Sequence, residues 1–381
     1  MRFPEFRGEW EKFRNDSLFN VVSEKNKGKQ ITSVLSASQT DGMVSRDSLG
    51  IDIKFEEDSI KNYKIVREGD YVIHLRSFQG GFAFSDRVGV CSPAYTILRP
   101  TQQISYGFLK PFFMSNKFID SLRLVTYGIR DGKSISVEEW LKLNTNLPSV
   151  EEQKKISIFL SLLDDRIATQ IKIIEKLESL IRGLITDVNS GRIAQCKSVY
   201  LRDLLIEQHE KNTNNYEVCS VSVSQGVINQ IDYLGRSFAA KEVLHYSVVN
   251  CGDIVYTKSP TGEFPYGIVK RSDITKPVAV SPLYGVYRPI NDYVGRYLHL
   301  YFKSPINAKN YLHKLIQKGA KNTINITNQH FLDNKILIPE KGWLDKIVKF
   351  AAAIEMKIAT ENKVLQTLQQ QKDFLLSKMF I

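Results

Sequence analysis

The sequence repeats itself in its two halves, and this restricts the fold more than any other feature. CSPAYTILRP at residues 91–100 resembles VSPLYGVYRP at residues 280–289, with Ser-Pro, Tyr and Arg-Pro in the same places. Other matches keep their order at offsets of 183 to 191 residues: Val34 with Val218, Tyr63 with Tyr246, Gly69-Asp70 with Gly252-Asp253, Ile135 with Ile326 and Pro148 with Pro339. Because solenoid repeats are far shorter, the chain contains a duplicated domain unit.

Each unit begins with a segment rich in Gly, Ser and Tyr. Short runs such as YVIHL and DIVYT have β-type composition, and turn residues interrupt them at short intervals. Gly69-Asp70 and Gly252-Asp253 are predicted to be turns just before a buried strand. We therefore expect two β-rich α/β modules, over residues 1–147 and 191–338.

From Pro148 onward the pattern changes to helix, and Ser149 with Glu152 fits a capping box. Apolar residues then recur four and three positions apart, which is a heptad seam with one polar member. The seam consists of Ile156, Leu160, Leu163, Ile167, Gln170, Ile174, Leu177, Ile181 and Leu184. A weaker copy consists of Ile347, Ala351, Ile354, Ile358, Glu361, Leu365, Leu368, Lys372 and Leu375. Long helices are predicted over residues 148–190 and 339–381.

A helix of roughly 40 residues is about 60 Å long, so neither module, 1–147 or 191–338, is large enough to bury it along its whole length. The two helices are therefore expected to pair, and an antiparallel pair needs only short links. Gln170 and Glu361 stand at the midpoints of the seams, so we expect them to lie near each other and set the register. The alternative that both are exposed beside the seam stays open. The predicted class is α+β, with an antiparallel coiled coil.

The charge of the chain favours a polyanionic partner. Lys and Arg number 52 against 41 Asp and Glu, a net charge of +11, which favours nucleic acid over a membrane surface. The four cysteines lie far apart without a CxxC pair, which indicates a reducing cytoplasm with neither a disulfide framework nor a zinc site. No run approaches the roughly 18 apolar residues of a membrane span.

The catalytic motifs sought in the sequence are incomplete, lie in an unsuitable element or are absent. GIRDGKS at residues 128–134 is one residue short of a phosphate-binding loop, and Glu361–Lys363 lies inside the heptad helix. The six histidines show no metal-binding spacing, and there is no GxSxG or Gly-rich dinucleotide turn. The sequence thus indicates a non-catalytic reader with no metal or cofactor of its own.

The segment LPSVEEQKKISIFLSLLDDRIATQIKIIEKLESL resembles the spacer helix of type I restriction–modification specificity subunits. The similarity falls on Leu147-Pro148, Glu152-Gln153, Ile156, Leu163-Asp164 and Ile167. RFPEFRGEW, EGDYVI, CSPAYTILRP and QKGAKNTINIT are also similar to that family, so the resemblance covers the whole chain in duplicate. It departs from the family at Trp343-Leu344, which replaces the Glu-Gln pair in the second helix.

The resemblance implies that residues 1–147 and 191–338 are target recognition domains, each reading one half of a bipartite site in double-stranded DNA. The helices at 148–190 and 339–381 would set the distance between the half-sites. Two methyltransferase subunits would bind the helices and methylate adenine at N6 with their own S-adenosylmethionine. Translocating endonuclease subunits, using ATP and magnesium, are implied as optional partners.

Duplicated frames with different loops can read different sequences, because direct readout depends on a few side chains at base edges. Loops that follow the Gly-Asp strands and Gly-basic segments near each module's end are the expected DNA contacts. They contain Arg76, Ser77, Gln79, Arg130 and Lys133 in the first copy, and Lys258, Ser259, Thr261, Lys318, Lys321 and Asn322 in the second. Weaker candidates are Ser38, Gln39, Ser45, Arg46, Ser224 and Gln225. The repeated Ser-Pro-x-Tyr and Arg-Pro strings are expected to form the shared scaffold.

Three alternatives remain at this point. The chain could be a stand-alone DNA-binding regulator, a structural scaffold whose basic charge is incidental, or an enzyme whose chemistry no motif reveals. Complex formation with an adenine methyltransferase subunit separates the first alternative from a specificity subunit. A sequence preference in DNA binding by the assembled complex separates the second.

Overall fold

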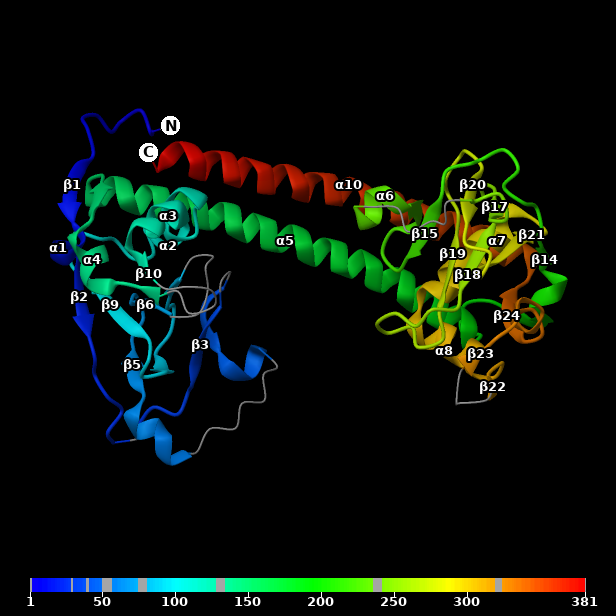
Figure 1. Cartoon of the computed structure of the whole chain (residues 1–381), viewed down its shortest axis with the longest axis horizontal. Coiled ribbons are helices and arrows are strands. Elements are labelled where there is room, and N and C mark those ends of the chain that lie inside the picture. The colour runs from blue at the N-terminus through cyan, green and yellow to red at the C-terminus, as the bar shows by residue number, and fades with distance from the viewer. Residues whose placement is uncertain are drawn as a thin grey trace. The chain divides into compact units, whose positions relative to one another are not determined.

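The computed structural model of the chain describes residues 2–28, 30–38, 41–49, 57–74, 81–127, 134–235, 242–318 and 324–380. The chain forms two compact units, Met1–Gln170 with Val364–Ile381 and Ile171–Lys363, called unit 1 and unit 2 here. Each unit contains a β-rich module and parts of two long helices, α5 (Val150–Asn189) and α10 (Lys341–Met379) (Figure 1). The predicted α+β class is confirmed, and the predicted domain limits stay predictions.

A four-stranded antiparallel sheet in the order β2-β9-β6-β7 forms the centre of unit 1. Its strands are β2 (Phe19–Val22), β9 (Thr96–Pro100), β6 (Tyr71–Ile73) and β7 (Phe82–Phe84). Side chains alternate between the two faces of a strand. Tyr71 and Phe82 therefore enter an aromatic cluster, whereas Val72 and Ala83 enter a second cluster that also contains Leu35 and Met43.

Shorter elements surround this sheet. Antiparallel ribbons pair β1 with β12, β3 with β4, β5 with β8 and β10 with β11. These strands are β1 (Glu11–Arg14), β3 (Leu35–Ser38), β4 (Gly42–Ser45), β5 (Lys64–Val66), β8 (Gly89–Cys91), β10 (Thr126–Tyr127), β11 (Ser134–Ile135) and β12 (Asn144–Leu147). The short helices are α1 (Asn15–Leu18), α2 (Lys110–Phe113), α3 (Asn116–Ser121) and α4 (Val137–Lys142), with 3-10 turns η1 (Arg46–Leu49), η2 (Glu57–Asn62) and η3 (Leu122–Val125).

Unit 2 repeats this plan strand by strand. Its four-stranded sheet has the order β14-β21-β18-β19, and its ribbons pair β13 with β24, β15 with β16, β17 with β20 and β22 with β23. The strands are β13 (Cys196–Tyr200), β14 (Leu205–Glu207), β15 (Cys219–Ser222), β16 (Gly226–Asn229), β17 (Ser247–Val249), β18 (Ile254–Thr257), β19 (Ile268–Arg271), β20 (Val278–Val280), β21 (Gly285–Pro289), β22 (Gln317–Lys318), β23 (Ile324–Asn325) and β24 (Lys335–Pro339). The internal repeat of the sequence is therefore a repeat of topology.

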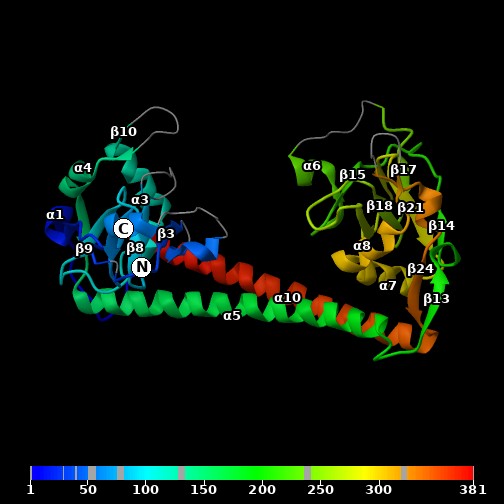
Figure 2. The ribbon, with the colours of Figure 1, turned by 90° about the horizontal axis from the view of Figure 1, so that it is seen from below.

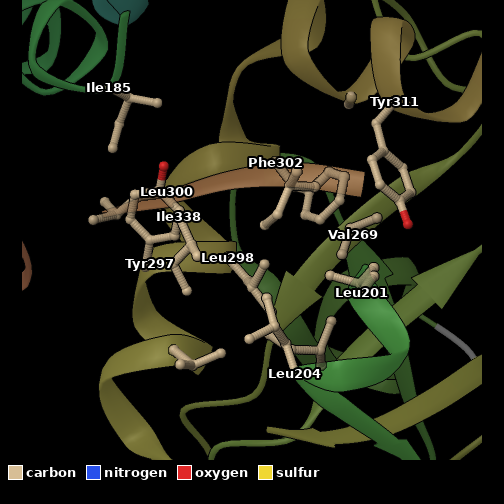
Figure 3. Packing of buried hydrophobic residues seen from close by; sticks show 14 of the residues in the cluster. Ile185, Leu201, Leu204, Val269, Tyr297, Leu298, Leu300, Phe302, Tyr311 and Ile338 are labelled. Atoms are coloured by element: carbon tan, nitrogen blue, oxygen red, sulfur yellow. The ribbon is translucent and has the colours of Figure 1, made fainter. Parts of the chain in front are cut away.

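Longer helices distinguish unit 2 from unit 1. They are α7 (Asp292–Lys303) and α8 (Pro305–His313), accompanied by α6 (Gln230–Leu234), α9 (Asn328–Phe331) and the 3-10 turn η5 (Leu201–Asp203). Helix α7 packs against β19 and β21, and α8 lies beside α7 (Figure 2). Tyr297, Leu298 and Phe302 of α7 are buried in a cluster with Leu201 and Ile338 (Figure 3). Among the described residues, α7 and α8 therefore add a helical layer to the apolar core of unit 2.

The repeated strings form a shared scaffold, as the sequence predicts. In unit 1, Arg99 donates two hydrogen bonds to Asp70, at 2.9 and 3.0 Å, and the Asp70 side chain is 2% exposed. In unit 2, the matching Arg288 contacts Asp253 at 3.3 Å. Gly69 and Gly252, which precede these aspartates, both have φ of 91°, a left-handed conformation that favours glycine. The predicted turns before buried strands are confirmed.

The seam predicted for the first long helix is confirmed by its burial. From Ile156 to Leu184, the nine predicted seam residues are buried or half-buried, and almost all residues between them are exposed. The polar seam member Gln170 is 8% exposed, so it does not lie on the solvated face. In α10, Glu361 has a side chain that is 12% exposed and contacts Lys357. The expected proximity of Gln170 and Glu361 stays a prediction.

The two helices run antiparallel, which follows from each unit taken alone. In unit 1, Ile156 and Leu160 near the start of α5 share a cluster with Met379 at the end of α10. In unit 2, Val188 near the end of α5 shares a cluster with Leu344 near the start of α10. Each unit therefore pairs the start of one helix with the end of the other, and the predicted antiparallel pair is confirmed.

The start of α5 is only partly the capping box predicted from the sequence. The Glu152 amide donates to Ser149 Oγ at 3.3 Å, which confirms Ser149 as the cap. The Glu152 carboxylate, however, accepts two hydrogen bonds from the Arg2 guanidinium, at 2.6 and 2.7 Å. Gln153 is buried, accepts from the Ser105 amide and donates to the carbonyl of Gln103. The Glu-Gln pair therefore ties α5 to distant segments of unit 1.

Candidate nucleic-acid interface

The expected contact loop of unit 2 extends directly from the buried strand β18. Lys258, Ser259 and Thr261 follow this strand, and residues 259–263 are exposed. The Ser259 amide donates to Thr257 Oγ1 at 3.3 Å, and Thr261 and Phe264 exchange backbone hydrogen bonds of 2.9 and 3.1 Å. The loop therefore presents polar groups from a fixed backbone, which is the arrangement that direct readout requires.

Two buried groups hold this loop in place. Phe264 is 4% exposed and belongs to the main cluster of unit 2. Gly267 closes the loop with φ of 101°, and a Cβ there would lie 1.9 Å from the Thr257 carbonyl oxygen. Partial burial also lowers the pKa of Lys258 from its usual value, because desolvation disfavours the ammonium form.

The matching loop of unit 1 lies outside the described residues. It contains the predicted contacts Arg76, Ser77 and Gln79. Its two ends are described: the His74 amide donates to the Gly81 carbonyl at 2.8 Å, which extends the β6–β7 ladder by one bond. The two loops therefore connect corresponding strands, β6 to β7 in unit 1 and β18 to β19 in unit 2.

The second pair of expected contacts belongs to matching ribbons. In unit 1, Thr126 pairs with Ile135 at the base of the β10–β11 ribbon, and Arg130 and Lys133 lie between the two strands, outside the described residues. In unit 2, Lys318 pairs with Ile324 in the β22–β23 ribbon, and Lys321 and Asn322 also lie outside the described residues. Both Gly-basic segments thus connect the strands of a two-stranded ribbon.

The weaker candidates lie on the β3–β4 and β15–β16 ribbons, and most serve contacts within the protein. Arg46 donates to Ser36 Oγ at 3.3 Å, and its guanidinium lies 6.0 Å from the centre of the Tyr63 ring. Ser38 Oγ donates to Asp41 at 2.8 Å. Ser224 shares a 3.3 Å hydrogen bond with Ser222, whose Oγ also accepts from the Gln225 amide. Ser45 is half-buried in β4, and Gln39 lies outside the described residues.

The sequence analysis does not predict one exposed apolar surface, which lies on α5. Ile158 and Leu162, one turn apart on α5, are 62% and 63% exposed, although they lie beside the heptad seam. Phe159 is 38% exposed and packs edge-to-face on Phe3. The signal in the sequence is the run ISIFLSLL, which contains more apolar residues than a single seam accounts for.

Metal-binding and membrane-spanning features are absent from the described ranges. No group of three or more His, Cys, Asp or Glu side chains gathers there in a geometry that could hold a metal ion. Among the same residues, no helix is both long and apolar enough to cross a bilayer.

The architecture defines a duplicated two-module protein with paired long helices, in which a common scaffold carries different loops. Residues 7–179 match the family described as Type I restriction modification DNA specificity domain. No curated protein sequence matches the chain.

Solved structures share the fold over the whole chain. The crystal structure of the type I restriction–modification S subunit from M. genitalium aligns with a TM-score of 0.59 at 13% identity, covering 100% of this chain and 99% of that one. A chain from a structure on complex assembly and conformational transition of the type I R-M system aligns with a TM-score of 0.56 at 14% identity, covering 99% and 98%. Residues 7–179 therefore match a type I DNA specificity domain, and the whole chain shares the fold of these solved type I structures, in agreement with the resemblance seen in the sequence.

Proposed function

We propose that this chain is the subunit that gives a type I restriction–modification complex its DNA sequence specificity. The observation that carries this proposal is the matched scaffold with unmatched loops. Buried Asp70 and Asp253 anchor the starts of β6 and β18, and each strand leads directly into a loop whose sequence differs between the copies. Each unit then reads one half of a bipartite site in double-stranded DNA.

The paired helices α5 and α10 would set the spacing between the two half-sites. The continuous seam supports this role, because its residues are buried or half-buried along α5 from Ile156 to Leu184. Lengthening both helices by the same number of residues should change the number of unread bases in the site and leave both half-sites unchanged. A changed half-site sequence would contradict this assignment.

Catalysis would reside in partner subunits. Two methyltransferase subunits would hold S-adenosylmethionine and methylate adenine at N6, and endonuclease subunits, where present, would use ATP and magnesium.

Ile158 and Leu162 suit a protein partner, because large apolar side chains are enriched at the centres of interfaces. The double variant I158E/L162E should lose co-elution with the methyltransferase subunit, whereas A168E, which adds a charge at another exposed position of α5, should retain it.

Mapping of N6-methyladenine in a host with and without this chain tests the function as a whole. A single bipartite motif should vanish when the gene is deleted. Replacing residues 1–147 by those of another specificity subunit should alter one half of the motif only. Methylation that is unchanged by deletion would favour a stand-alone DNA-binding regulator, and binding without any sequence preference would favour a scaffold.

A further inference from the structure

A cavity of about 300 Å³ lies in unit 1. The β1–β12 ribbon forms one side, α2 and α3 form another, and the end of α10 closes it. Trp10, Phe112, Phe118 and Phe380 supply an aromatic wall. A cavity with a mainly apolar lining and a few convergent polar groups is the usual form of a small-molecule site.

The aromatic wall is fixed by its own packing. The ring of Phe380 lies 5.5 Å from Phe112 and 6.3 Å from Trp10, and Phe112 lies 5.2 Å from Phe118, measured between ring centres. Phe118 and Phe380 are at most 5% exposed. The wall therefore exists before any ligand arrives, and its half-buried members Trp10 and Phe112 offer ring surface to a planar group.

The opposite side of the cavity is polar and positively charged. Lys12 and Asn146 are register partners in the β1–β12 ribbon, so their side chains share one face, and Asn144 lies two residues along the same strand. Lys117 of α3 adds a second ammonium group. Within the part of the chain that the structure describes, none of these four side chains makes a hydrogen bond or ion pair with another residue.

The chemistry of the lining selects the ligand. The two lysines exclude a cation and favour a phosphate or carboxylate, because an ammonium group binds an anion as a point charge. The two asparagine amides offer donor and acceptor pairs, which match the polar edge of a nucleobase. Aromatic rings stack on any base through its π face. We propose that this cavity binds a nucleotide, with the base on the aromatic wall and the phosphate at Lys12 and Lys117.

The second copy of the module does not keep this lining. Residues 335 and 337 occupy the places of Asn144 and Asn146 when the two Pro residues, Pro148 and Pro339, are aligned, and they are Lys335 and Leu337. The amide pair is therefore not part of the shared scaffold, and it belongs to unit 1 alone. The same ligand chemistry is present in a free mononucleotide and in an unpaired nucleotide of a strand.

Fluorescence titration of the full-length chain tests the proposal, because Trp10 lies in the cavity wall. AMP should quench the emission, adenosine should bind about tenfold more weakly, and inorganic phosphate alone should leave the emission unchanged. The W10F variant should lose most of the AMP signal. A 5′-phosphorylated single-stranded oligonucleotide that binds more tightly than AMP identifies a strand as the source, and the reverse order identifies a free nucleotide.

Two variants make the test decisive. The double variant K12A/K117A should bind AMP about tenfold more weakly, whereas K27A/K61A, which removes two exposed lysines outside the cavity, should bind normally. Ser121 is exposed at the rim, so S121F should fill the cavity and abolish AMP binding while the near-UV circular dichroism is retained. AMP binding that survives in both K12A/K117A and S121F overturns the proposal, as does a signal that persists in W10F.

Discussion

Acidification should loosen unit 2 through one histidine at the edge of its main sheet. His299 of α7 accepts a hydrogen bond from the Arg271 amide of β19 through Nδ1, at 3.2 Å. This bond requires a neutral ring nitrogen. Burial of the ring, together with the nearby cations Lys270, Lys303, Arg271 and Arg296, lowers the pKa of His299 to about 3.

The sign and size follow from linkage between protonation and folding. The unfolded chain binds the proton at about pH 6.5, whereas the folded chain stays neutral until about pH 3. The stability contributed by the neutral ring is therefore complete above pH 6.5 and falls as the pH drops from 6.5 toward 3. At pH 5, which is about 1.5 units below the unfolded pKa, the loss is about 2 kcal/mol.

Hydrogen exchange read by mass spectrometry can measure this loss where it arises. The opening free energy of a peptide covering residues 268–272 should fall by about 2 kcal/mol between pH 7.5 and pH 5 in the wild type. In H299Q, the amide oxygen can still accept from Arg271 but does not titrate, so its loss over the same range should be about 2 kcal/mol smaller. Equal losses in the two proteins would refute the assignment to His299.

Three further predictions concern the scaffold and the loop. R99A should lower the unfolding free energy of its unit by about 2 kcal/mol, because it leaves the buried carboxylate of Asp70 without its bidentate partner. R288A removes a single longer contact to Asp253, so it should lower the unfolding free energy by less. Urea unfolding measures both losses. G267A should cost about 2–3 kcal/mol, since its Cβ would meet the Thr257 carbonyl. G262A, which has a φ of 51° but open space around it, should cost only about 1 kcal/mol in the same assay. If Lys258 contacts a phosphate, K258A should make the plot of log binding constant against log salt concentration less steep by about one unit. Fluorescence anisotropy with labelled DNA at several salt concentrations measures this slope.

Periodicity in the sequence predicts the helices and the repeated scaffold well, because both depend on local spacing. The heptad spacing from Ile156 to Leu184 gives the buried face of α5, and the repeated Gly-Asp and Arg-Pro strings give matching strands in both units. Short-range patterns cannot reveal partners that are distant in the sequence. Glu152 fits a capping box locally, but its carboxylate pairs with Arg2, which is 150 residues away.

The same limit applies to the site. The sequence predicts which loops follow the buried strands, because turn residues and β-type runs mark them. It does not predict the cavity of unit 1, because Lys12, Lys117 and Asn146 come together only when β1, α3 and β12 pack. Nor does it predict the position of His299, since a lone histidine on a helix has no local pattern that points to the edge of a sheet.

The buried Asp–Arg pair explains how one scaffold can carry two different loops. In each unit the aspartate lies at the start of the strand that enters the loop, and it also accepts a backbone hydrogen bond from its own turn, from Arg67 at 2.9 Å or Asn250 at 2.8 Å. Removing one partner of such a pair leaves a buried charge uncompensated, which is why R99A and R288A should destabilise their units. The strand is therefore held in place independently of the loop sequence. Residues beyond the strand are free to differ between the copies, provided that the loop ends meet, as His74 with Gly81 and Thr257 with Ile268 do.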